Sequence, residues 1–151
     1  MEQEVMISMG KLGAAGAIAF AAFGSALGVG TAGAATVGAW KKCYATNRSA
    51  PFILMTFVGA PLSQTIYGMI LMNTIIKAAA ESPMGYPAMI GAGIFGGLAM
   101  GASSWFQGIV GAAAADAFNE TGKGFGNYLM AIGTVETVAL FVMVFIMGTI
   151  G

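Results

Sequence analysis

The charged residues of this chain are confined to a few short segments, and long apolar stretches lie between them. No charged residue falls within 12–40, 49–76 or 82–115, and a fourth apolar stretch, 124–151, contains only Glu136. A membrane-spanning helix needs about 20 predominantly apolar residues, so each stretch can hold one. We therefore expect four spanning helices, at about 12–40, 50–76, 86–116 and 126–150.

The composition excludes several classes of soluble protein. Of the 151 residues, 58% are hydrophobic and 8% are charged, against about 25% charged in average usage. A net charge of +0 removes the basic surface of a nucleic-acid-binding protein. The absence of His and the single cysteine, Cys43, exclude zinc sites, disulfide frameworks and His-based catalysis. We expect an all-α membrane protein, because the alternating segments of a membrane β-barrel are missing.

The basic residues predict the orientation of the chain in a cell membrane. Four lie after the first and third spans, and only Lys11 and Lys77 lie on the opposite side. By the positive-inside rule, the hairpin loops 41–50 and 118–123 are cytoplasmic and both termini are outside. The acidic start of the chain is unlike a secretory signal, so the first apolar stretch is interpreted as a retained span.

The two halves of the sequence are alike, which predicts a duplicated helical hairpin. A shift of 80 residues aligns Gly13 with Gly93, and a shift of 72 aligns Gln64 with Glu136. The change of shift indicates that the first hairpin loop is eight residues longer. Both hairpins run in the same direction, as a parallel repeat. The predicted hairpins comprise residues 1–78 and 79–151.

The first and third spans are rich in glycine and alanine along nearly their whole length. Gly24-x-x-x-Gly28 and Gly97-x-x-x-Gly101 are small-xxx-small patterns, which let helix backbones approach closely. We expect these two helices to form a tight inner layer, with the second and fourth spans outside. The glycines at 28–33 match a dinucleotide fingerprint, but they lie within a span and follow no strand, so no catalytic nucleotide site is expected.

Glu136 is the only charged residue in the interior of a predicted span, since Asp116 lies at the very end of the third. It lies 13 residues after Lys123, which is about 20 Å along a helix and therefore near the bilayer centre. An ionised carboxylate at that depth costs at least about 2.5–3.5 kcal/mol. It must be neutralised by a proton, a cation or a basic partner, and no Lys or Arg of this chain lies at that depth. The sequence therefore predicts an ion site at Glu136.

Polar side chains of the second and third spans lie at a similar depth. Gln64 is 13 residues before Lys77, and Ser63 and Tyr67 share its helix face. Gln107 is nine residues before Asp116; Ser103 and Ser104 lie on the same span. Pro61 is expected to kink the second span and to loosen nearby backbone oxygens.

A carboxylate with amide and hydroxyl oxygens, and without thiolate or imidazole, favours a hard cation. Two glutamines exceed what a proton site needs, so the residues favour Na⁺ over H⁺. Coupling to H⁺ stays open as the alternative.

These features resemble the rotor-ring proteolipid of V-type ATPases, also called the K or c proteolipid. The resemblance rests on the duplicated hairpin, on the run Gly59-Ala-Pro-Leu-Ser-Gln-Thr-Ile-Tyr-Gly68 and on Val135-Glu136-Thr137, and it extends over all four spans. In that family the first hairpin has lost its carboxylate and the second keeps it. Gln64 and Glu136 show this pattern here.

The resemblance to the Na⁺-transporting members of the family implies an ion site between the second, third and fourth spans. It implies Glu136 as the charged ligand, Gln64 and Gln107 as amide ligands, Ser63 as a hydroxyl ligand and the carbonyl of Ala60 as a further ligand. Tyr67 would hydrogen-bond the Glu136 carboxylate. One position and one run of residues depart from the family: Ser63 stands where Thr is common, and Ser103-Ser104-Trp105-Phe106 replaces a Gly/Ala pattern.

The resemblance also implies the role and the partners of the chain. Identical protomers would form a ring in the lipid bilayer, with the first and third spans as its inner layer. The ring would turn against a stator membrane subunit that supplies an arginine, and central-stalk subunits would contact the cytoplasmic loops. ATP hydrolysis elsewhere would drive the rotation, or an ion gradient would reverse it. The alternatives are the same role with H⁺, a stand-alone small channel or carrier, and a purely structural membrane protein.

Overall fold

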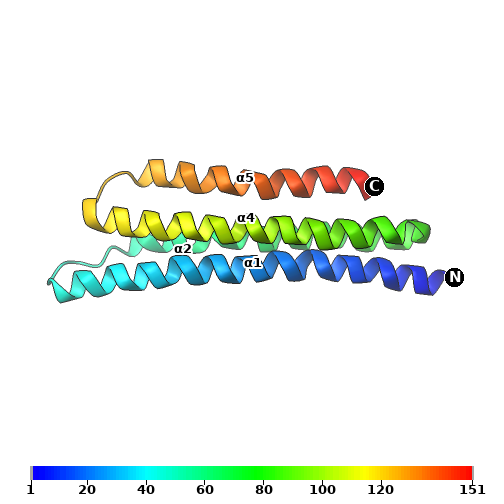
Figure 1. Ribbon diagram of the computed structural model, residues 1–151, viewed down its shortest axis with the longest axis horizontal. Helices are drawn as coiled ribbons and strands as arrows, with labels where there is room; N and C mark the ends of the chain where they lie inside the picture. Colours follow the sequence, from blue (N-terminus) through cyan, green and yellow to red (C-terminus); the bar gives the residue numbers. More distant parts are fainter. Residues whose placement is uncertain (1, 151) are drawn as a thin grey trace.

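The computed structural model describes residues 2–150 and consists of long helices that lie side by side (Figure 1). Four helical stretches are long and apolar enough to cross a membrane, and no strand occurs among residues 2–150. The all-α fold with four spanning helices is therefore confirmed. The elements are α1 (Gln3–Ala45), η1 (Phe52–Leu54), α2 (Met55–Gly59), η2 (Ala60–Leu62), α3 (Ser63–Glu81), η3 (Pro83–Gly85), α4 (Tyr86–Thr121) and α5 (Phe125–Ile150).

The helices extend beyond the predicted spans, which shortens the hairpin loops. α1 continues to Ala45 and α4 to Thr121, so residues 41–45 and 118–121, which the sequence assigned to loops, are helical. The charges at these positions mark the start of the polar region, and a helix can continue into water beyond that point. α4 ends where Gly122 adopts a left-handed φ of 65° and its N–H donates to the carbonyl of Phe118, 2.8 Å away.

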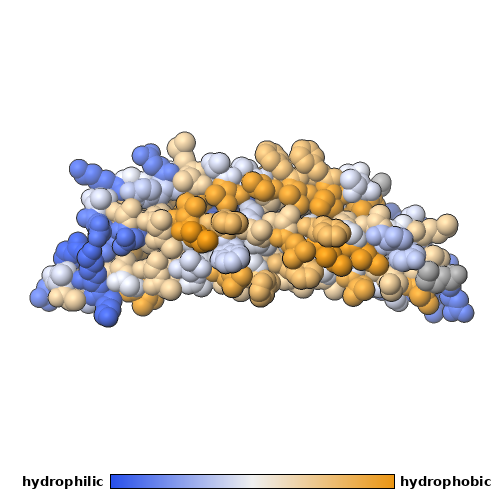
Figure 2. All heavy atoms as spheres, in the orientation of Figure 1, coloured by the Kyte–Doolittle hydropathy of each residue, from blue (hydrophilic) through white to orange (hydrophobic). Residues whose placement is uncertain are grey.

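Both ends of the chain lie at one end of the bundle, and the α1–η1 and α4–α5 loops lie at the other (Figure 1). Hydrophilic residues gather at the two ends, and an apolar band covers the face between them (Figure 2). Large apolar side chains in this band are exposed, including Phe95 and Phe145 at 71% each. A surface of this kind needs lipid or other protein to cover it.

Glycines bring α1 and α4 into backbone contact. A Cβ atom on Gly93 would overlap the carbonyl of Gly13, and one on Gly108 would overlap the carbonyl of Gly28. The 80-residue shift of the sequence repeat relates the members of each pair, so equivalent positions of the two halves meet. The expected close packing of the two Gly/Ala-rich helices is confirmed. Their place as the inner layer of a ring stays a prediction.

Pro61 interrupts the second spanning stretch. Proline has no N–H to donate to the carbonyl four residues earlier, and the chain passes through the 3-10 turn η2 between α2 and α3. The carbonyl oxygen of Phe57, which loses this donor, faces α4 at Gly111, where an added Cβ would lie 2.8 Å from it. The distortion predicted at Pro61 thus takes the form of a short 3-10 turn.

The loop end of the bundle carries polar contacts between α1 and α4. Cys43 is buried, and its Sγ donates to Oδ1 of Asn119 at 2.9 Å. Lys42 and Glu120 form an exposed ion pair. Their hydrogen bond and mutual attraction raise the pKa of Lys42 and lower the pKa of Glu120. Cys43 was placed in a loop by its charged neighbours, but it lies inside the α1–α4 contact.

Candidate ion-binding site

Glu136 lies in the middle part of α5 and is partly buried against α3 and α4. The hydroxyl of Tyr67 on α3 donates to its Oε1 at 2.7 Å. Nε2 of Gln107 on α4 donates to its Oε2 at 3.2 Å. Each carboxylate oxygen therefore has one donor, and the two donors come from two different helices.

Two buried glutamines extend this arrangement towards the first hairpin. Gln64 and Gln107 are both fully buried, and Nε2 of Gln64 donates to Oε1 of Gln107 at 2.8 Å. Nε2 of Gln107 is also 3.3 Å from the carbonyl oxygen of Ile132. Gln107 thus joins α3 to α5 through α4.

The hydroxyl of Ser63 completes the arrangement at the 3-10 turn. Its Oγ lies 3.1 Å from the carbonyl oxygen of Ala60 and 3.2 Å from Oε1 of Gln64. The six groups that the sequence singled out are therefore brought into one hydrogen-bonded set, which we call the polar cluster: Ala60, Ser63, Gln64, Tyr67, Gln107 and Glu136. The structure brings these groups together; their role as ion ligands stays a prediction.

The chemistry of the polar cluster suits a monovalent cation. It offers one carboxylate and several neutral oxygens, and a single positive charge would neutralise it, whereas a divalent ion would keep an uncompensated charge in an apolar surrounding. A glutamine amide carries both a donor and an acceptor, so rotation of its amide group can turn an oxygen towards an ion. Within residues 2–150 there is no cluster of His, Cys, Asp and Glu able to hold a transition metal.

Two serines one helical turn before Gln107 lie outside the polar cluster. Ser103 Oγ donates to the carbonyl of Val135 at 2.8 Å, and Ser104 Oγ donates to the carbonyl of Pro61 at 2.7 Å. Neither contacts the Glu136 carboxylate; both hold backbone beside the polar cluster. Ser25 of α1, 3.1 Å from Ser104, was not identified from the sequence. The sequence feature that could have identified Ser25 is a hydroxyl side chain within an otherwise Gly/Ala-rich helix.

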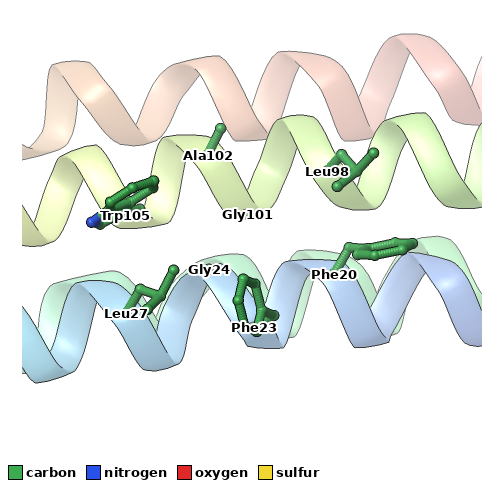
Figure 3. A pocket seen from close by; sticks show the side chains of 8 residues that line it. All are labelled: Phe20, Phe23, Gly24, Leu27, Leu98, Gly101, Ala102 and Trp105. Atoms are coloured by element: carbon green, nitrogen blue, oxygen red, sulfur yellow. The ribbon is translucent and has the colours of Figure 1, made fainter.

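The groove between α1 and α4 does not provide a competing ion site. A groove of about 190 Å³ lies between α1 and α4 above the close approach of Gly24 and Gly101. In Figure 3, Phe20, Phe23 and Leu27 of α1 stand opposite Leu98 and Trp105 of α4. Its walls are apolar except for the indole N–H of Trp105, so it offers no oxygen ligand.

The second hairpin, which carries Glu136, is similar to a protein family of known function. Residues 90–147 match the family model of the C subunit of ATP synthase. The matched segment runs through most of α4 and α5 and includes both Gln107 and Glu136. A search of curated proteins found no match.

Proposed function

We propose that this chain is the ion-carrying subunit of the membrane rotor ring of a V-type rotary ATPase, and that each protomer carries one Na⁺ at the polar cluster. One observation carries the proposal: a single carboxylate in the middle of a spanning helix accepts hydrogen bonds from Tyr67 and Gln107. Through Gln107 it is connected to the amide of Gln64, the hydroxyl of Ser63 and the carbonyl of Ala60. The similarity of the second hairpin to the C subunit of ATP synthase supports it. The parallel sequence repeat extends that similarity to the first hairpin.

In this proposal the bound Na⁺ neutralises Glu136, so the protomer can face lipid without the cost of a buried charge. When rotation brings it opposite the stator subunit, an arginine of that subunit replaces the ion as the counter-charge. The ion then leaves, and a new one enters before the protomer returns to lipid. ATP hydrolysis elsewhere in the complex drives this cycle, and an ion gradient reverses it.

The proposed assembly uses the two ends of the bundle differently. Identical protomers pack into a ring with α1 and α4 as the inner layer. The end with loops 46–51 and 122–124 faces the cytoplasm and the central-stalk subunits, and both termini lie outside. The excess of basic residues at the loop end supports this orientation.

The neutral oxygens near Glu136 favour Na⁺ over H⁺, because a proton site needs only the carboxyl and one acceptor. The hydrogen bonds of Glu136 are compatible with a bound ion. Both carboxylate oxygens accept a hydrogen bond, from Tyr67 and from Gln107, as an ionised carboxylate does. A protonated carboxyl would need an acceptor for its own proton. The Tyr67 hydroxyl can also accept, and this is the specific feature that keeps H⁺ as the second candidate.

Two measurements test the proposal. Native mass spectrometry of the full-length protein in mild detergent should give one large oligomer of fixed size; a monomer or dimer would contradict the ring and favour a stand-alone channel or carrier. Membrane vesicles that hold the whole complex should take up ²²Na⁺ when ATP is added, and a protonophore should not stop the uptake. Uptake that a protonophore abolishes would indicate H⁺ coupling.

A further inference from the structure

A buried pair of hydroxyl groups joins three segments just behind the polar cluster. Ser104 of α4 is fully buried, and Ser25 of α1 is 2% exposed. Ser104 Oγ lies 2.7 Å from the carbonyl oxygen of Pro61 and 3.1 Å from Ser25 Oγ. A carbonyl can only accept, so the Ser104 hydroxyl donates to Pro61 and can itself accept the hydroxyl proton of Ser25. The pair therefore links α1 and α4 to the 3-10 turn η2.

The carbonyl that Ser104 holds is mechanically coupled to a proposed ion ligand. The ring of Pro61 fixes its φ angle, so of the two rotations between the carbonyl of Ala60 and the carbonyl of Pro61 only ψ of Pro61 is left. Holding the second carbonyl in place therefore restricts the orientation of the first. The Ala60 carbonyl oxygen is in turn 3.1 Å from Ser63 Oγ, which is 3.2 Å from Oε1 of Gln64.

The same stretch of α4 serves both sides of the polar cluster. Ser104 reaches η2, and Gln107, one helical turn later, reaches both Gln64 and Glu136. Gly28, opposite Ser104, has no room for a side chain, because an added Cβ would overlap the Ser104 carbonyl. The same added Cβ would lie 2.8 Å from Cβ of Pro61, so α1 packs tightly against both Ser104 and η2.

We infer that Ser104, assisted by Ser25, is a positioning residue that holds the Ala60 carbonyl and Ser63 in their ion-binding arrangement and thereby sets the affinity for Na⁺. This inference rests on the proposed function. It assigns to the α1–α4 contact a part in ion binding, although no side chain of α1 belongs to the polar cluster.

The test compares Ser104→Ala, Ser25→Ala and the wild-type full-length protein. The readout is the Na⁺ concentration that half-protects Glu136 from a carbodiimide, which reacts with the protonated carboxyl; the labelled peptide is quantified by mass spectrometry. Hydrogen bonds in membranes are worth amounts that correspond to about a three- to fifteen-fold change in affinity. We expect a shift of that size for Ser104→Ala and a smaller one for Ser25→Ala, which leaves the bond to Pro61 in place.

A second readout separates positioning from a general loosening of the protein. Without Na⁺, the pH at which labelling is half-maximal should be the same in Ser104→Ala and wild type, because Ser104 does not contact Glu136. The ratio of the Li⁺ and Na⁺ half-protection concentrations should change, because the ligand spacing changes. A shift in the pH midpoint with an unchanged Li⁺/Na⁺ ratio would overturn the inference.

The remaining outcomes are also decisive. Wild-type affinity in Ser104→Ala would refute the positioning role while leaving the proposed function intact. No protection of the wild-type protein by Na⁺ would refute the proposed Na⁺ site and this inference with it. If Ser104→Ala does not assemble, Ser104→Cys, which keeps the shape and weakens the donor, should give an intermediate affinity, and wild-type affinity there would refute the inference.

Discussion

The two hairpins begin with similar helices and return through different ones. α1 and α4 meet at repeat-related glycines, whereas the return of the first hairpin is broken at Pro61 and carries Gln64. The return of the second is the continuous α5, which carries Glu136 and has Gly133 at the position that aligns with Pro61. The common helices make the close packing, and the differing ones, together with Gln107 of α4, make the polar cluster.

This difference divides the requirements of an ion site between the two halves. The second hairpin supplies the charge of Glu136 and one amide, that of Gln107. The first supplies neutral groups: the amide of Gln64, the hydroxyl of Ser63 and the carbonyl of Ala60, which lies in the 3-10 turn caused by Pro61. A second carboxylate at position 64 would require a second cation in the same apolar surrounding, and Gln64 avoids this cost.

The largest expected effect comes from removing the only charged group of the polar cluster. Glu136→Gln keeps the size of the side chain, so the ring should assemble. Ion-coupled turnover should be abolished, because an amide can neither neutralise Na⁺ nor pair with the proposed stator arginine. ATP-driven ²²Na⁺ uptake by vesicles measures this, and native mass spectrometry checks assembly. A variant that does not assemble would assign Glu136 a structural role.

The next largest effect should come from the shared helices. Gly93→Ala places a Cβ on the carbonyl of Gly13, and overpacking of this kind typically costs about 1–3 kcal/mol or more. The matched control is Gly91→Ala on the same helix, where nothing lies within 4 Å of an added Cβ. Thermal unfolding in detergent should show a lower midpoint for Gly93→Ala alone. Equal midpoints would contradict the backbone contact.

A smaller effect is expected from the neutral side of the polar cluster. Gln64→Ala removes a fully buried amide that donates to Gln107. Loss of a group that only supports a metal site costs about 10–100-fold in affinity, so loss of a direct ligand should weaken Na⁺ binding by at least about tenfold. The Na⁺ concentration that half-protects Glu136 measures this. An unchanged value would remove Gln64 from the ligands.

The smallest effect should come from the ion pair at the loop end. Because the pKa of Glu120 is lowered in the folded protein, the contribution of the pair to stability is present above the ordinary carboxyl pKa and is lost as the pH falls through the lowered value. Because the pKa of Lys42 is raised, the contribution of the pair to stability is lost at the alkaline end only as the pH rises through this raised pKa.

Lys42→Ala should therefore lower the unfolding midpoint slightly at neutral pH, and less in high salt. At a pH below the lowered pKa of Glu120 the difference from wild type should vanish. Lys77→Ala, which removes a more exposed pair with Glu81 at 3.9 Å, is the control and should change the midpoint less. A large, salt-independent effect of Lys42→Ala would contradict the interpretation of this contact as an exposed surface ion pair.

The sequence was sufficient to predict which residues form the polar cluster. Glu136 and Gln64 lie at the same depth by their distance from flanking charges, and helical spacing places Ser63 and Tyr67 on the face of Gln64. The sequence could not predict the partners of Ser103 and Ser104, because a serine hydroxyl can bond to many backbone carbonyls and its spacing does not select one. The predicted helix ends were also wrong, because charged residues mark where the chain enters the polar region and not where the last helical hydrogen bond lies.

The most direct test of the central claim is carbodiimide labelling of Glu136 in the detergent-solubilised wild-type protein at fixed pH, with Na⁺, with K⁺ and with neither. The reagent needs a protonated carboxyl, so an ion bound at the polar cluster should protect Glu136. We predict protection by Na⁺ and none by K⁺ at equal ionic strength. Labelling that responds to pH alone would contradict the sodium site and would make the chain a carrier of protons.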